Sequence, residues 1–240
     1  MLQLLAESVR WTVVALVAYG LSKLLRCRLN SDPCAPKIRS VWLPLVPLAA
    51  TLLGLIALSL WAPRNQEGLP MSLRLTFWRS VGFLINVLPA GLAMFRSGEP
   101  IRSTGLGRHN LWQACVIGLV LGGIWCLPAA LGQKLAPQFG GWAGWLLFMA
   151  MVGFAEEFLF RGYLQTRLIA RLGRWRGWVL AASLFAASHL PRYLFHDGLG
   201  PGAAIVATAQ LIPSGLALGF IMLRTQNLLA PAILHTMTDF

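Results

Sequence analysis

The chain has 240 residues, of which 57% are hydrophobic and only 12% are charged, and its mean hydropathy is +0.65. A typical soluble domain carries about 25% charged residues, which it needs to cover its surface. The composition therefore excludes a soluble enzyme, a disordered chain and a disulfide-rich secreted scaffold. It predicts an all-α, polytopic membrane protein.

The net charge of +12 is the second feature of the composition. In a soluble protein such an excess would indicate nucleic-acid binding. In a membrane protein, however, basic residues gather in cytoplasmic loops and lie against anionic lipid. The charge therefore predicts membrane lipid as a partner and no nucleic acid, and it leaves the oligomeric state open.

The apolar segments predict a single membrane domain over residues 1–240 with about eight helices, or seven if a weaker segment lies in the interface. A membrane helix needs about 20 mostly apolar residues. Four segments meet this requirement without any charge: 41–62, 111–133, 135–155 and 198–223. Four weaker segments are 11–25, 77–95, 177–190 and 226–240. Pro213 is expected to kink or break the segment in which it lies.

The basic residues of the loops predict an orientation. The loops at 23–39, 96–108 and 161–176 hold, together with Arg224, fourteen lysines and arginines, whereas the alternate loops hold only Arg64, Arg74, Lys134 and Arg192. The positive-inside rule then makes the first set cytoplasmic and, with eight helices, places both termini outside. The N-terminus lacks a basic leader region and a clear cleavage site, so it is expected to be a retained helix.

Five ionisable residues interrupt the apolar segments of the last part of the chain. They are Glu156, Glu157, His189, His235 and Asp239. A charge at membrane depth costs several kcal/mol and is by default a candidate functional residue. The remaining acids, among them Glu99, and the run Arg167, Arg171, Arg174 and Arg176 are expected to be exposed charges.

Spacing assigns different tasks to these residues. Adjacent glutamates point about 100° apart on a helix, so Glu156 and Glu157 cannot do the same job. Glu157 and Arg161 are i,i+4 and are expected to pair. Glu156 is then the freer carboxylate, and among Phe and Leu it is suited to taking a proton near neutral pH. His235 and Asp239 are also i,i+4 and share one helix face.

Three motifs in these helices resemble a known family. They read EExxxR at 156–161, FxxxH at 185–189 and HxxxD at 235–239. This is the motif set of the CPBP intramembrane proteases, which include the CAAX prenyl endopeptidases and the bacteriocin-processing Abi-like proteins. The resemblance covers residues 141–240, whereas residues 1–140 match only as hydrophobic helices. Asp239 departs from the family, in which this position is often Asn.

The resemblance implies an endopeptidase that cuts a membrane-associated protein or peptide inside the bilayer, near a C-terminal tail or in a peptide precursor. Glu156 would activate the attacking water, and Glu157 and Arg161 would shape the site. His189 and His235 would hold a metal or stabilise the oxyanion, with Asp239 beside them. The compact chain fits a bacterial member in the inner (cytoplasmic) membrane.

Two questions stay open in the sequence. The first is the metal: His189, His235 and Asp239 form a plausible Zn²⁺ set, while the rival is a metal-free glutamate mechanism. No HExxH motif is present. The second is the function class, because membrane acids and histidines also build proton- or ion-coupled transporters. A non-catalytic immunity or interaction protein on the same fold is the third reading.

Overall fold

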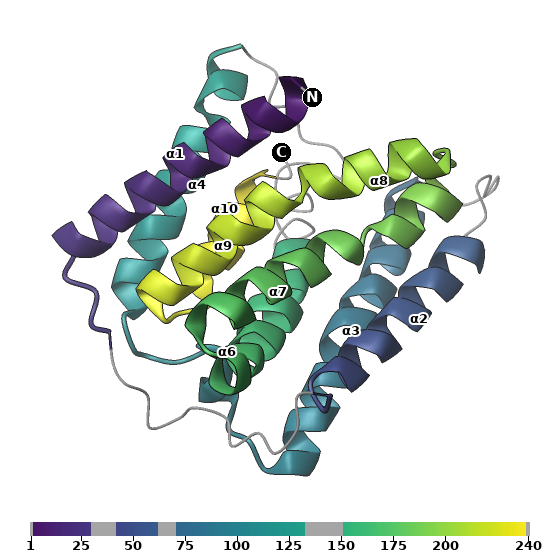
Figure 1. The fold of residues 1–240 in the computed structure, drawn as a ribbon, viewed down its shortest axis with the longest axis horizontal. Coiled ribbons are helices and arrows are strands. Elements are labelled where there is room, and N and C mark those ends of the chain that lie inside the picture. The colour runs from purple at the N-terminus through teal and green to yellow at the C-terminus, as the bar shows by residue number, and fades with distance from the viewer. Residues whose placement is uncertain (1, 30–41, 62–70, 133–150, 239–240) are drawn as a thin grey trace.

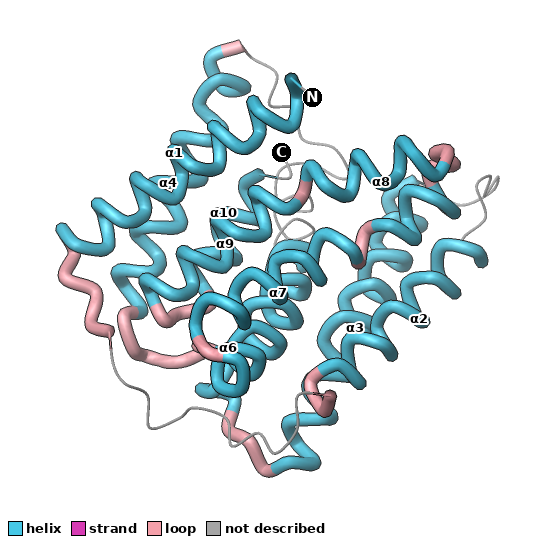
Figure 2. Tube along the Cα trace, viewed as in Figure 1, coloured by secondary structure: helices cyan, strands magenta, loops and turns pink. Residues whose placement is uncertain are grey.

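The computed structural model describes residues 2–29, 42–61, 71–132 and 151–238, and these residues form helices with no strand among them (Figures 1 and 2). The all-α prediction is thereby confirmed. The elements are α1 (Leu2–Leu24), α2 (Leu45–Trp61), α3 (Met71–Ser97), η1 (Ile101–Thr104), α4 (Leu111–Leu131), η2 (Phe158–Gln165), α6 (Thr166–Leu172), α7 (Arg174–Ala187), η3 (Arg192–His196), α8 (Pro201–Gln210), α9 (Ile212–Thr225) and α10 (Leu229–Thr238).

The described residues 151–157 are helical and continue through η2 into α6 without a break. We call residues 151–172 the motif helix. With α8 and α9 taken as one broken segment, the described parts of the chain make eight helical segments, as expected. Within these parts, four segments are long and apolar enough to cross a membrane: 4–24, 80–97, 111–128 and 201–225.

Several helix boundaries differ from the predicted ones: α3 begins at Met71 rather than at residue 77, and the motif helix continues to Leu172 although the predicted segment ends at residue 155. Helix α1 begins at Leu2 rather than at residue 11, and the predicted segment 198–223 is divided between α8 and α9 around Leu211. Pro213 lies in the first turn of α9, where its missing N–H leaves no hydrogen bond unmade. Most of the predicted segment 135–155 lies outside the described residues.

Large apolar side chains cover the outside of the helices. Leu16, Leu53 and Leu84 are 64%, 68% and 55% exposed, and only 17% of the α1 span is buried within the protein. A soluble protein rarely exposes large contiguous apolar surfaces. Lipid is as apolar as these leucines, so the exposed faces fit a membrane environment.

The motif helix lies at the centre of the bundle, where residues 157–165 are all buried. Its middle part, η2, is a π-helix, a rare form that often occurs at functional sites. Phe160, Leu164 and Leu168 pack there with Phe185 of α7 in one apolar core cluster. Gly173, with φ +84°, then provides the turn that joins α6 to α7.

Three glycines let α10 pack closely against its neighbours. A Cβ at Gly118 or Gly122 of α4 would lie 2.8 Å from Ile233 Cβ or 2.9 Å from Met237 Cβ. A Cβ at Gly153 of the motif helix would lie 2.8 Å from the backbone nitrogen of Thr236. Small residues at four-residue spacing allow such close approach of membrane helices. These contacts fix the helix that carries His235.

Two charges predicted to be exposed are in fact paired inside the protein. Arg167 is 2% exposed and pairs with Glu99, and it also donates to Ser103 Oγ at 3.2 Å and to the Tyr163 carbonyl at 3.0 Å. The prediction for Arg167 and Glu99 was wrong because the partners lie 68 positions apart, beyond the reach of local spacing. Arg161, counted in a cytoplasmic loop, also lies within the motif helix.

One end of the bundle is joined by polar contacts between turns. Asn110 Nδ2 donates to the carbonyls of Arg28 and Thr225, at 2.9 and 2.8 Å, and Asn227 Nδ2 donates to those of Gly107 and His109, at 3.1 and 2.8 Å. These bonds connect the end of α1, the start of α4 and the α9–α10 turn. We call this end the basic end, because exposed arginines surround it.

Candidate active site

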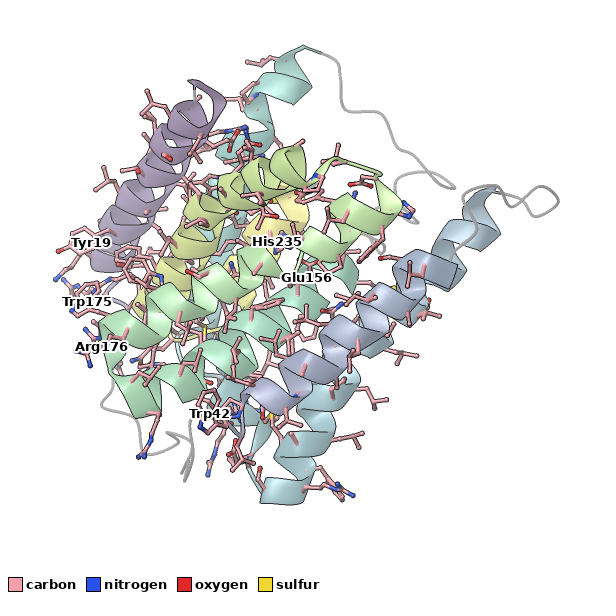
Figure 3. All side chains as sticks on the ribbon, turned by 45° about the vertical axis from the view of Figure 1, so that its right-hand side comes forward. Tyr19, Trp42, Glu156, Trp175, Arg176 and His235 are labelled. Carbon is pink, nitrogen blue, oxygen red and sulfur yellow. The ribbon has the colours of Figure 1, made fainter. Side chains whose placement is uncertain are left out.

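The three sequence motifs meet inside the bundle. Glu156 and Glu157 lie on the motif helix, His189 in the turn that follows α7, and His235 on α10. Glu156 and His235 lie close together in Figure 3, away from Tyr19, Trp175 and Arg176. Asp239 lies outside the described residues, so its place in the site stays a prediction.

Glu157 connects an arginine and a histidine. It is fully buried, and its Oε1 accepts from Arg161 Nη1 and His235 Nδ1, each at 2.7 Å. Arg161 also donates to the carbonyl of Gly215 at 3.3 Å, and its guanidinium lies 4.2 Å from the centre of the Phe185 ring. Glu157 therefore fixes the His235 ring while Arg161 balances its charge.

Hydrogen bonds at Nδ1 fix the orientation and the tautomer of both histidine rings. His235 Nδ1 faces a carboxylate, and His189 Nδ1 lies 3.0 Å from the Phe185 carbonyl. Both oxygens accept, so each Nδ1 carries the hydrogen. In a neutral imidazole the other nitrogen, Nε2, is then a hydrogen-bond acceptor.

Glu156 faces both of these nitrogens. Its Oε2 lies 3.9 Å from His189 Nε2 and 3.9 Å from His235 Nε2. Both separations are too long for a direct hydrogen bond, and a polar gap of this size suits one bridging water. The Glu156 side chain is 22% exposed, whereas Glu157 is sealed from solvent.

The two histidines lie at different distances along their helices, although both reach Glu156. Counted along straight helices at about 1.5 Å per residue, His235 lies about 9 Å from the start of α10, and His189 lies about 22 Å from the start of α7. Both nevertheless reach the same oxygen of Glu156. The helices must therefore be tilted or begin at different levels, which membrane helices commonly do.

Aromatic rings hold the histidines in place. The Phe185 ring centre lies 5.0 Å from that of His189, 5.9 Å from that of His235 and 5.3 Å from that of Phe160, each in an edge-to-face arrangement. Such pairs contribute about 0.5–1.5 kcal/mol beyond area burial. Phe185, a member of the apolar core cluster, therefore also orients both histidine rings.

A pocket of about 380 Å³ opens onto the histidines. Besides His189 and His235 it is lined by Glu7 of α1 and by Arg192 and Tyr193 of η3. Burial raises the pKa of the Tyr193 phenol, which therefore stays protonated near neutral pH. The motifs gave no sign of Glu7 or Tyr193, since one lies on the first helix and the other beyond the FxxxH motif.

The described residues include no group of three His, Cys, Asp or Glu side chains placed to hold one metal ion. The Nδ1–H group of each histidine is nevertheless bonded to an oxygen, which leaves Nε2 oriented toward Glu156. This orientation suits a metal ion as well as a water molecule. The predicted third ligand, Asp239, lies outside the described residues. The Zn²⁺ set of His189, His235 and Asp239 thus stays a prediction.

The fold and the site define an integral membrane protein with a buried carboxylate–histidine cluster that opens to a pocket. Residues 137–240 match the family described as type II CAAX prenyl endopeptidase Rce1-like, so this part of the chain is similar to CAAX-type intramembrane proteases. The match spans all three motifs and confirms the resemblance that they predict. Comparison with curated proteins and with solved structures gave no match.

Proposed function

We propose that the chain hydrolyses a peptide bond of a membrane-associated substrate with a water molecule that Glu156 activates. The observation that carries this proposal is the pair of 3.9 Å separations from one Glu156 oxygen to two histidine nitrogens. Together with the family match, this geometry favours a hydrolytic site. A carboxylate base beside the neutral His189 imidazole is an arrangement that draws protons from water.

The first step is attack on the scissile carbonyl. A water between the three side chains donates one hydrogen to Glu156 and the other to His189 Nε2. Glu156 takes its proton as the water oxygen bonds to the carbonyl carbon. The same proton then passes from Glu156 to the leaving amine as the C–N bond breaks, which regenerates the carboxylate.

The second task is to stabilise the oxyanion that forms in that step. When its ring is protonated, His235 donates from Nε2 to the oxyanion while Nδ1–H stays bonded to Glu157. A buried carboxylate that holds the far nitrogen stabilises the positive charge on the ring. Preorganised donors of this kind contribute much of the rate enhancement in dry sites.

The substrate we propose is a protein or peptide precursor held in the membrane, cut near its anchored segment. The description of the matched family is that of a CAAX prenyl endopeptidase. In this chain the pocket is polar on one side, with Glu7 and Arg192, and it lies within an apolar bundle. This arrangement fits a peptide backbone that enters from the bilayer.

The test is cleavage of a quenched-fluorescent membrane peptide by the full chain in proteoliposomes. Glu156→Gln is expected to lower kcat by about 10²- to 10⁴-fold, the usual contribution of a general base. The matched control is Asp197→Asn, the same chemical change at an exposed carboxylate that pairs with Arg192. Cleavage by a folded Glu156→Gln variant at the wild-type rate overturns the proposal.

A further inference from the structure

The charges and the pocket of this protein lie at opposite ends. Exposed or partly exposed basic side chains surround the basic end: Lys23, Arg26, Arg28, Arg96, Arg102, Arg108, Arg171, Arg174, Arg176 and Arg224. Among the described side chains, the other end carries Arg10 and Arg192 with Glu7 and Asp197, which nearly balance. The asymmetry predicted from loops therefore persists in the folded chain.

Exposed aromatic side chains at the basic end are typical of a membrane surface. Trp42, Trp175 and Tyr19 are 75%, 66% and 44% exposed. Trp175 and Tyr19 lie near Arg176 in Figure 3, and Lys23 and Arg224 both lie over the Tyr19 ring. Trp and Tyr prefer the headgroup region, and Lys and Arg beside them prefer its cytoplasmic side.

The catalytic pocket opens away from this surface. Its lining includes Glu7 near the start of α1, Arg192 in η3 and Thr238 at the end of α10, all remote from the basic turns. Glu156 lies 16 residues before the end of α6, at most about 24 Å along the helix axis, because the π-helical part η2 rises less per residue than an α-helix. A bilayer core is about 30 Å thick, so Glu156 lies deep in the bilayer as seen from the basic end.

Because the pocket lies at the end of the bundle opposite the basic end, we propose that it opens on the non-cytoplasmic face of the membrane and that the substrates are translocated proteins. The proposal rests on the proposed function for the cleavage itself. Such a substrate is anchored in the bilayer and presents its scissile bond in the outer half. Its soluble part lies outside the cytoplasm both before and after cleavage.

The orientation is tested without any substrate. In a background with Ser at Cys27, Cys34, Cys115 and Cys126, single cysteines replace Leu199 at the pocket end or Leu29 at the basic end, which are 37% and 46% exposed. We expect a membrane-impermeant maleimide to label Leu199→Cys in intact cells and Leu29→Cys only after permeabilisation. The reverse pattern overturns the proposal.

Cleavage is then measured from each side of sealed vesicles. A membrane-anchored reporter with its cut site outside is expected to be cleaved, and the same reporter inverted is not. Cleavage of the inverted reporter alone overturns the substrate class but leaves the proposed function intact. If detergent-solubilised protein cleaves neither reporter, the proposed function fails as well, while the labelling pattern still shows on which face the pocket opens.

Discussion

Two buried arginines lie six positions apart on the motif helix and pair with carboxylates in different ways. Arg161 pairs with Glu157, four residues earlier, and this carboxylate also holds His235. Arg167 pairs with Glu99 from the α3–η1 connection and also donates to nearby hydroxyl and carbonyl groups. The first pair faces the histidines, and the second faces the basic end.

The difference shows that burial of a charge does not by itself indicate a reactive site. Arg167 is as deeply buried as Arg161, at 2% and 1% exposed. Arg161 differs in that its partner, Glu157, also accepts a hydrogen bond from His235, and His235 lines the pocket. We therefore expect the first pair to control the rate of cleavage and the second to control folding.

The largest effect is expected at Glu157. In Glu157→Gln the amide can no longer both accept from Arg161 and stabilise a charged His235, so kcat should fall by about 10²- to 10⁴-fold. Peptide cleavage in proteoliposomes measures this fall. Glu99→Gln is the matched change in the other pair, and an equal loss of kcat in the folded Glu99→Gln protein would contradict the division of roles.

The next effect is on stability. Arg167→Met leaves Glu99 without its partner, and the free energy of unfolding should fall by about 3–5 kcal/mol, as measured by detergent-induced unfolding. Because the loss comes from an unpaired carboxylate, adding Glu99→Gln should recover part of it. No recovery in the double variant would show that packing, and not charge, dominates at this site.

A smaller effect is expected from two neighbouring glycines of α4. Gly122→Ala would press on Met237 and should cost about 1–3 kcal/mol, with slower cleavage because α10 carries His235. Gly123→Ala meets nothing within 4 Å and should be neutral or stabilising by up to about 1 kcal/mol. Equal behaviour of the two variants would argue against close packing of α10.

The smallest effect is expected from metal removal. If Glu156 and the histidines act on water directly, cleavage should be unchanged after dialysis against a chelator, and elemental analysis of active protein should find no stoichiometric Zn²⁺. Loss of activity that returns with Zn²⁺ would instead favour the ligand set of His189, His235 and Asp239.

The sequence reveals the helices because apolar runs of about 20 residues have few other uses. It also predicts which residues meet, since Glu156, His189 and His235 stand out in apolar surroundings and Glu157 and Arg161 pair at i,i+4 as expected. The Arg167–Glu99 pair and the α10 contacts of Gly118 and Gly153 depend on residues distant in the chain. Local spacing cannot show such partners.

The π-helix η2 determines the directions in which the motif helix presents Glu157 and Arg167 to their partners. Each residue of a helix turns the chain about the helix axis, by about 100° in an α-helix, so removing one residue from 158–165 would rotate all later residues relative to Glu156. Arg167 would then leave Glu99, or else the glutamates would leave the histidines. The length of η2 is therefore under constraint from both ends, and single-residue deletions there should be far less tolerated than substitutions of its apolar side chains.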